Sequence, residues 1–298
     1  MPRSFRWFLL SAAAATFFGA LPAGKAIASP APPLTSPATH RHLPGKFVLS
    51  QLVTPNLEAS TRFYSGLFGW SIHRLGTPER PRAVAYNGRE VVALLVEHTL
   101  SNPDQPPFWF PFLSSKDADT TTAQSAMLGA RVHLEGRNLP ALGREAIVVD
   151  PRGATFGVLT ATAGDSADGD AAVGSWVWSA LLSSDPEGAA KFYGSLFGYR
   201  IETLDEHHFL ASSGEVARAT FNVLPPRFPA DAPARWVRFV RVLSVGATAE
   251  DAVKLGGHIV VPAHPDRDGV MIAIIADPAG AVFGIMELPT DLPQGEAK

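Results

Sequence analysis

The residues of this chain that could carry out chemistry are few and scattered. The sequence contains nine histidines and no cysteine, which excludes thiol nucleophiles, zinc ribbons, iron–sulfur clusters and disulfide frameworks. The histidines form no spaced metal cluster, and the chain has neither a serine elbow of the G-x-S-x-G kind nor a phosphate-binding glycine loop. Glu97, His208 and Arg241 remain as weak catalytic candidates, suited to proton transfer or charge stabilisation.

Two of these candidates also have a simpler structural interpretation. Glu97 would act as a general base if it faced a pocket and burial raised its pKa, but a solvated acid at a strand end is the favoured alternative. His207 and His208 are adjacent on an expected strand, so their imidazoles point to opposite faces and one could enter a pocket. A partly exposed pair at a turn or strand is the favoured alternative here.

Composition limits the class of protein before any element is assigned. The chain has 298 residues, of which 46% are hydrophobic and 18% charged, so it can bury a sizeable core. Its formal net charge is −3, and a general nucleic-acid binder would carry a basic surplus. We therefore expect no nucleic-acid partner. The 26 glycines and 26 prolines indicate many turns and short elements.

Residues 1–28 are typical of a secretory signal peptide. Arg3 and Arg6 form its positive start, Trp7–Leu21 is an apolar run, and Ala-Ile-Ala at 26–28 is a small-x-small cleavage site. The alternative is an uncleaved membrane anchor, but the run is short of the ~20 residues that a span needs. We expect cleavage, no membrane span afterwards, and a periplasmic or secreted location.

The segments on either side of the main body read as connectors. Residues 29–45 hold five prolines and almost no periodic apolar pattern, which predicts an extended tether. His40 and His42 within it are interpreted as solvated side chains rather than a weak metal site. Residues 291–298 form a polar tail.

The rest of the chain is a duplication. Asn56–Trp70 (NLEASTRFYSGLFGW) aligns with Asp185–Tyr199 (DPEGAAKFYGSLFGY), and Asp150–Gly157 (DPRGATFG) aligns with Asp277–Gly284 (DPAGAVFG). The offset between the copies stays nearly constant along the chain, so two homologous domains are implied.

We place these domains at residues 46–162 and 175–290. The joint between them, residues 163–174, is small, acidic and poor in apolar side chains, as a linker should be. Because tandem copies can pair with each other, a monomer would be sufficient, and a homodimer is the alternative.

Each copy predicts the order strand, helix and three strands, twice over. Asn56 and Asp185 are expected helix N-caps, and Gly69 and Gly198 are expected to end the same helices in a left-handed conformation. The Asp-Pro-x-Gly sequences supply turns between the last two strands of each copy. The whole chain therefore reads as four βαβββ modules, an α+β fold.

The paired motifs FYSGLFGW and FYGSLFGY, with DPRGATFG and DPAGAVFG, resemble the vicinal oxygen chelate superfamily, which includes glyoxalase I, extradiol dioxygenases and bleomycin-resistance proteins. The resemblance covers residues 46–290. It implies that two βαβββ modules pair into an incomplete barrel with an internal pocket. It also implies His or Glu ligands on the first and last strands of each module in the members that use a metal.

Carried onto this chain, at least three of the four ligand positions in each copy hold side chains that cannot coordinate a divalent metal. Only the fourth position of the first copy offers a donor, Glu97. The other ligands would fall at Leu49, Trp178, Phe110, Val237, Gly157 and Gly284. The resemblance is therefore to metal-free, glyoxalase-like members, and we expect no metal and no cofactor.

The same positions predict an aromatic pocket. Gln51 shares a strand face with Leu49, and Trp178 takes the corresponding place in the second copy. A cleft lined by aromatic rings with a polar handle suits an apolar or aromatic small molecule, although the rings could equally fill the barrel as core. The expected lining is Leu49, Gln51, Trp109, Phe110, Phe112, Trp178, Trp236 and Phe239.

We therefore expect an exported, metal-independent protein that binds a small molecule. Whether it is also an enzyme stays open. The first alternative is a metal-independent lyase, isomerase or hydrolase that uses Glu97, His208 or Arg241. The second alternative is an interaction module of the cell envelope, with sealed barrels and an exposed apolar patch.

Overall fold

The computed structural model of the chain describes residues 31–98, 106–226 and 228–288. The expected signal peptide 1–28 and the tail 291–298 lie outside these ranges. None of the helices in the described ranges has both the length and the apolar character needed to cross a membrane.

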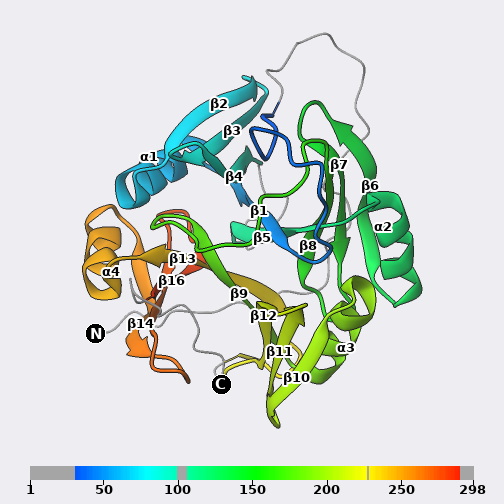
Figure 1. Cartoon of the computed structure of the whole chain (residues 1–298). Coiled ribbons are helices and arrows are strands. Elements are labelled where there is room, and N and C mark those ends of the chain that lie inside the picture. Colours follow the sequence, from blue (N-terminus) through cyan, green and yellow to red (C-terminus); the bar gives the residue numbers. More distant parts are fainter. Residues whose placement is uncertain (1–30, 99–105, 227, 289–298) are drawn as a thin grey trace.

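The chain order repeats one pattern of a strand, a helix and three strands (Figure 1). The elements of the first copy are β1 (Phe47–Thr54), α1 (Leu57–Phe68), β2 (Ser71–Thr77), β3 (Arg80–Asn87), β4 (Glu90–Glu97), β5 (Phe108–Ser114), α2 (Ala118–Met127), β6 (Arg131–Leu139), β7 (Gly143–Val149) and β8 (Thr155–Ala161). Those of the second copy are β9 (Trp176–Ser183), α3 (Pro186–Phe197), β10 (Arg200–Asp205), β11 (His208–Ser213), β12 (Val216–Val223), β13 (Arg235–Val242), α4 (Val245–Lys254), β14 (His258–Pro265), β15 (Met271–Ala276) and β16 (Val282–Glu287).

Each copy forms one eight-stranded sheet. The strand orders are β2-β3-β4-β1-β5-β8-β7-β6 and β10-β11-β12-β9-β13-β16-β15-β14. The first strands of the two modules in a copy are antiparallel neighbours at the centre of the sheet, and each pairs in parallel with the last strand of its own module. The prediction of tandem α+β domains, each built from two βαβββ modules, is confirmed.

Both sheets curl into half-barrels. Four strands lie between β3 and β7, so a flat sheet would hold them about 24 Å apart at ~4.8 Å per strand. Arg82 of β3 nevertheless acts electrostatically on the carboxyl of Glu145 of β7. In the second sheet, Arg267 beyond β14 forms an ion pair with Asp205 of β10, the opposite edge strand. We call β1–β8 the first half-barrel and β9–β16 the second.

Local sequence determines where the helices begin and end. The side chain of Asn56 accepts a hydrogen bond from the backbone N–H of Ala59 at 2.9 Å and caps α1. Asp185 does the same for α3, with Pro186 in the first turn. Gly69 and Gly198 close these helices with φ of 70° and 71°. These boundary predictions are confirmed.

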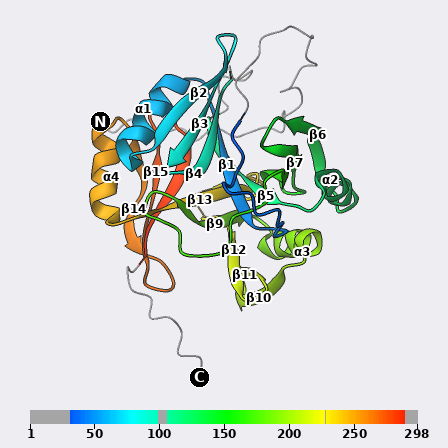
Figure 2. The same cartoon turned by 45° about the horizontal axis from the view of Figure 1, so that its top comes forward.

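The two half-barrels pack back to back, with the helices at the sides (Figures 1 and 2). One core is built mainly from α1, β1, β3 and β4 with α4, β13, β15 and β16, and a second mainly from α2, β5, β7 and β8 with α3, β9, β11 and β12. Each interdomain core thus combines one module from either copy. The concave faces of the sheets carry two smaller apolar clusters of their own.

The Pro-rich segment is not a free tether. Thr39 donates its backbone N–H to the carbonyl of Ala163 at 2.8 Å, and Leu43 donates to Asp165 Oδ2 at 2.6 Å. Ala31 and Leu34 pack against the apolar cluster on the concave face of the first half-barrel. The expectation of an extended tether is wrong for residues 31–45, which form a strap bound along the first domain. Gly164 leaves room for this approach, because a Cβ at that position would lie 2.5 Å from Thr39 Oγ1.

The linker 163–174 is also bound rather than loose. Asp168 accepts two hydrogen bonds from the Arg218 guanidinium, at 2.6 and 2.8 Å, and pairs with Lys46 at 3.1 Å. Arg241 donates to the carbonyl of Ala171 at 2.7 Å. The acidic Asp168 of this linker thus supplies a specific partner for cations of both domains.

Candidate functional site

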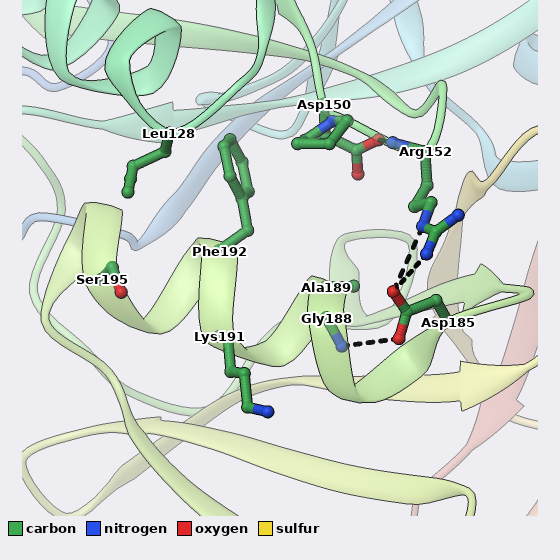
Figure 3. A pocket seen from close by; sticks show the side chains of 10 residues that line it. Leu128, Asp150, Arg152, Asp185, Gly188, Ala189, Lys191, Phe192 and Ser195 are labelled. Carbon is green, nitrogen blue, oxygen red and sulfur yellow. Dashed lines mark hydrogen bonds and ion pairs between the residues drawn. The ribbon is translucent and has the colours of Figure 1, made fainter.

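One groove of about 460 Å³ lies between the end of α2, the Asp-Pro-Arg-Gly turn and α3 (Figure 3). Its polar groups mostly satisfy one another: Asp185 accepts from Arg152 at 2.6 Å and from the backbone N–H of Gly188 at 2.9 Å. Leu128 and Phe192 add apolar surface. The groove forms where two domains meet, on the outside of both half-barrels, so no local sequence pattern predicts it.

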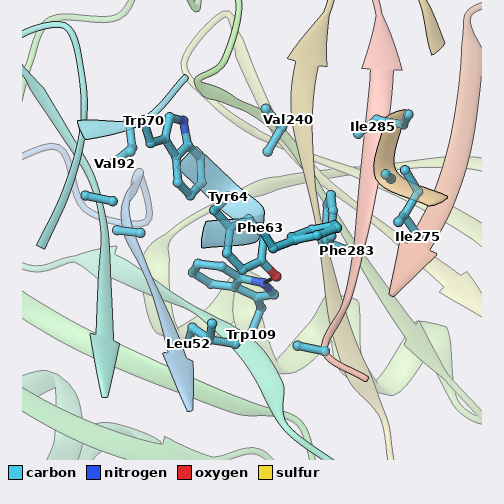
Figure 4. Close-up of a cluster of buried hydrophobic side chains, with 14 of the residues drawn as sticks. Leu52, Phe63, Tyr64, Trp70, Val92, Trp109, Val240, Ile275, Phe283 and Ile285 are labelled. Carbon is cyan, nitrogen blue, oxygen red and sulfur yellow. Dashed lines mark hydrogen bonds between the residues drawn. The ribbon is translucent and has the colours of Figure 1, made fainter. Parts of the chain in front are cut away.

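The sequence motifs shared by the two copies form a buried contact between the domains. Trp109 Nε1 donates to the Tyr64 hydroxyl at 2.8 Å, and that hydroxyl donates to Asp277 Oδ2 at 3.2 Å. Asp277 also accepts from three backbone N–H groups of its own turn. Burial raises the pKa of the Tyr64 hydroxyl well above its usual value, and the Asp277 charge adds to this. Figure 4 shows Tyr64 between Trp70, Trp109 and Phe283.

The second copy repeats the contact in the other direction. Trp236 Nε1 donates to the Tyr193 hydroxyl at 3.1 Å, which lies 3.2 Å from Asp150 Oδ2. Trp109 and Trp236 therefore belong to the interdomain cores, and their assignment to a ligand pocket is wrong. The reason is strand alternation. Trp109 and Trp236 each precede a residue that faces the concave side, Phe110 and Val237, so both Trp side chains point to the opposite face of their sheet.

The interior of the first half-barrel combines buried rings with polar groups. Leu49, Phe110 and Phe112 are at most 2% exposed and form its apolar floor. Gln51, on the same face of β1, is 7% exposed. These four residues therefore lie together on the concave face as the sequence indicated, but most of the rings are used as core.

The interior of the second half-barrel is more open. Trp178 is half-buried on the floor and is surrounded by Ala180, Val237, Phe239 and Met286. Around this floor, further apolar side chains are also half-exposed: Leu182, Ile272 and Ile274. The structure thus brings Trp178 and Phe239 together as predicted and leaves apolar surface accessible above them.

One cross-strand pair explains part of the difference. Gln51 lies opposite Phe110 in the first sheet, and Ala180 lies opposite Val237 at the same place in the second. The smaller pair removes side-chain volume directly beside Trp178. The side chains on the concave face therefore fill less of the second half-barrel than of the first.

The three catalytic candidates do not converge. Glu97 Oε2 accepts the backbone N–H of Leu57 at 2.8 Å, so its carboxylate satisfies the start of α1. His208 pairs with Asp205 at 2.7 Å near the edge of the second half-barrel. Arg241 binds the linker carbonyl of Ala171. Glu97 lies in the other domain from His208 and Arg241, and nothing gathers the three into one site.

Sequence reasoning missed a charged cluster in the first half-barrel. Glu145 of β7 is 1% exposed, and Arg137 Nη2 lies 2.7 Å from its Oε1. Arg82 of β3 acts on the same carboxyl, whose pKa is raised by burial against the opposing effect of the two arginines. The available signal was a Glu two residues before the inward-facing Ile147, at the start of the apolar run Ala146–Val149.

Family comparison agrees with this architecture. The model of the Glyoxalase/Bleomycin resistance protein/Dioxygenase superfamily matches residues 46–158 and again residues 177–285. The chain belongs to this superfamily. The resemblance noted in the sequence is confirmed, and both copies are members.

Curated relatives of this superfamily member cover most of its length. It is 27% identical over 271 residues to the anthracycline biosynthesis protein DauV of Streptomyces sp.. The match covers 83% of this chain and 95% of that protein. It is 26% identical over 273 residues to the anthracycline biosynthesis protein DnrV of Streptomyces peucetius, with 85% and 97% covered.

Solved structures share the superfamily fold at lower identity. The Mn(II)-bound glyoxalase from Novosphingobium aromaticivorans has a TM-score of 0.61 at 15% identity, with 83% of each chain covered. The 2,3-dioxygenase LapB from Pseudomonas sp. KL28 has a TM-score of 0.58 at 14% identity, with 87% and 97% covered. These likenesses concern the fold.

The side chains present do not fit a metal of the kind held by the Mn(II) relative. The register places Leu49, Phe112 and Gly157 in one row across three neighbouring strands, so Phe112 rather than Phe110 is level with the other two positions. None of the three offers a nitrogen or oxygen donor from its side chain. Within the described ranges, no three His, Asp or Glu side chains gather as a metal site would require.

Proposed function

We propose that this superfamily member is an exported protein that binds a planar, largely apolar small molecule on the concave face of the second half-barrel, without using a metal. The observation that carries the proposal is the half-buried Trp178 on the floor of that face. A large apolar ring left partly accessible in a concave surface is the usual mark of a ligand contact.

Polar groups beside Trp178 support its role as a platform. Its Nε1 lies 3.4 Å from Thr220 Oγ1, and Asn222 Nδ2 donates to the same hydroxyl at 3.1 Å. This chain of contacts holds the indole in one orientation. A ring that stacks on the exposed indole face therefore meets a prepared surface.

Arg235 offers a hydrogen bond at the edge of the same face. It lies opposite Leu182 in the register, and its guanidinium rests over the Phe228 ring at 4.6 Å. Its Nε is buried and lacks a hydrogen-bond partner. Burial lowers the pKa of this guanidinium. A carbonyl or phenolate oxygen of the ligand would satisfy the donor.

The two Streptomyces relatives are named for anthracycline biosynthesis. Anthracyclines are planar fused rings with quinone and phenol oxygens, which matches an indole platform with an arginine at its edge. We therefore extend this ligand class to the present chain and propose a polycyclic aromatic ligand.

Titration with daunorubicin tests the proposal directly. We expect saturable binding, followed by the fluorescence of the drug, and an affinity about tenfold lower in Trp178→Leu, since stacking on one indole contributes about 1–1.5 kcal/mol. Met127→Ala is the control, because Met127 is 87% exposed on α2. Absence of binding, or equal affinity in Trp178→Leu, would refute the assignment.

Export and metal independence have separate tests. Expressed from the whole sequence, the protein should be recovered outside the cytoplasm. Its intact mass should equal that of a chain that starts at Ser29. Metal analysis of that material should find no stoichiometric Zn, Ni, Fe or Mn, and dialysis against a chelator should leave ligand affinity unchanged. An intact mass equal to that of the full-length chain would contradict export. One bound metal per chain would contradict metal independence.

A further inference from the structure

A second, chemically different site is indicated inside the first half-barrel. Four polar side chains face its interior from four strands: Gln51 on β1, Arg82 on β3, Arg137 on β6 and Glu145 on β7. Gln51, Arg82 and Glu145 each lie two residues along their strand from a member of the interior cluster, namely Leu49, Val84 and Ile147, and so face the same side. Arg137 lies directly opposite Glu145 on the neighbouring strand.

Glu145 has one satisfied and one unsatisfied oxygen. Arg137 Nε donates to Oε1 at 2.8 Å. Oε2 is buried and has no hydrogen-bond partner. A buried carboxylate oxygen without a donor costs free energy, so the site is prepared to accept a hydrogen bond from a group that enters it.

Arg82 and Gln51 also have unused hydrogen-bonding capacity. Within the described ranges, the half-buried Arg82 guanidinium makes no hydrogen bond or ion pair, and burial and Arg137 lower its pKa. The amide of Gln51 is likewise without a hydrogen bond there, although the residue is only 7% exposed. Two guanidiniums face one carboxylate, so the cluster carries an excess of one positive charge.

The corresponding places in the second half-barrel hold other side chains. The registers align Glu145 with Ile272, since each lies opposite a residue of the last strand at the same position. They align Arg82 with His208 in the same way, and Gln51 with Ala180. The polar site thus belongs to the first half-barrel alone.

We propose that the first half-barrel binds a small 2-hydroxycarboxylate with an apolar substituent. Its carboxylate pairs with Arg82 and accepts from the Gln51 amide, and its hydroxyl donates to Glu145 Oε2. Its substituent lies among Phe110, Leu94 and Val84 on the apolar floor. This site is independent of the aromatic ligand proposed for the second half-barrel.

Two matched probes test the site by calorimetry at neutral pH on the chain from Ser29. 3-Phenyllactate and 3-phenylpropanoate differ only in the hydroxyl that would meet Glu145. We expect 3-phenyllactate to bind at least about tenfold more tightly, since hydrogen bonds to a charged acceptor are stronger than those between neutral groups. Equal affinities, or no binding of either acid at millimolar concentration, would overturn the proposal.

Variants locate the bound acid. Arg82→Gln should weaken 3-phenyllactate about tenfold or more, and Gln51→Leu should weaken it several-fold while keeping a similar volume in the core. Met127→Ala is the matched control. Loss of binding in Trp178→Leu, with affinity kept in Arg82→Gln and Gln51→Leu, would place the probe in the second half-barrel and refute this assignment. Circular dichroism of each variant establishes that it is folded.

Discussion

The ring of Phe112 occupies the place where a side chain at Gly157 would project. A Cβ built on Gly157 falls 2.2 Å from Cδ1 of that ring, and Phe239 stands in the same relation to Gly284. The resemblance assigns a metal-binding carboxylate to both glycines in metal-using relatives. In this chain, a phenylalanine from the neighbouring strand fills that space in each half-barrel.

Adding a methyl group at this place should destabilise the fold. Gly157→Ala drives a Cβ into the Phe112 ring, so we expect a loss of about 1–3 kcal/mol in the free energy of unfolding, measured in urea. Gly246→Ala on α4 is the control, because its Cβ meets no atom within 4 Å and alanine favours a helix. If the clash is the cause, Phe112→Leu should restore part of the loss. Full stability of Gly157→Ala would contradict this.

The tyrosine hydroxyls should hold the domains together. Tyr64→Phe leaves Trp109 Nε1 and Asp277 Oδ2 without their shared partner in a buried place, so we expect a loss of about 1–3 kcal/mol. Tyr193→Phe is the matched variant in the other interdomain core and should cost a similar amount. Thermal unfolding of both variants measures this. A change below about 0.5 kcal/mol in both would show that the hydroxyls are dispensable.

The Asp168 contacts should make stability depend on acid. Arg218 and Lys46 lower the pKa of Asp168 to about 2, from an unfolded value of 3.8. A depressed carboxyl pKa contributes stability that is fully present above pH 3.8 and is lost as pH falls through 2. After screening at this partly exposed site, we expect Asp168→Asn to lose about 1 kcal/mol at pH 7 and only a small part of that near pH 2. An equal loss at both pH values would argue against an ionic origin.

The buried Arg238 should be replaceable by an apolar side chain. Its guanidinium donates to Ser50 Oγ at 3.2 Å and to Ser179 Oγ at 2.6 Å and lies over two aromatic rings, but among the described residues it has no carboxylate partner. Burial lowers its pKa to about 9. Because the folded state disfavours the charged form, a constant penalty is present below pH 9 and shrinks as pH rises from there toward 12.5.

We therefore expect Arg238→Met to be neutral or more stable by about 1–3 kcal/mol at pH 7, with the advantage falling above pH 9. Arg238→Ala is the comparison, since it leaves a cavity between the domains and should be less stable than Arg238→Met. Urea unfolding at pH 7 and pH 10 measures both. A loss above about 2 kcal/mol in Arg238→Met would show that the hydrogen bonds outweigh the desolvation of the charge.

Much of the candidate site could be read from period-2 alternation. Alternation predicts that Leu49 and Gln51 share a face, and the structure has both on the concave face with Phe110 and Phe112, because a strand alternates its side chains regardless of what it packs against. The same rule excluded Trp109 and Trp236 once the facing residues were known. The partnership of Arg82 with Glu145 could not be read, because it joins strands five steps apart in a sheet whose curl is a tertiary property.

The sequence by itself determined the duplication, the βαβββ order, the helix caps and the lack of ligand-type side chains at the metal positions, since these depend on local pattern and residue type. Only the tertiary structure decided that residues 31–45 form a bound strap and that the two copies pack back to back. It also decided that the second half-barrel is the more open one. These features arise from contacts between segments far apart in the sequence, and local sequence patterns do not predict the free energies of such contacts.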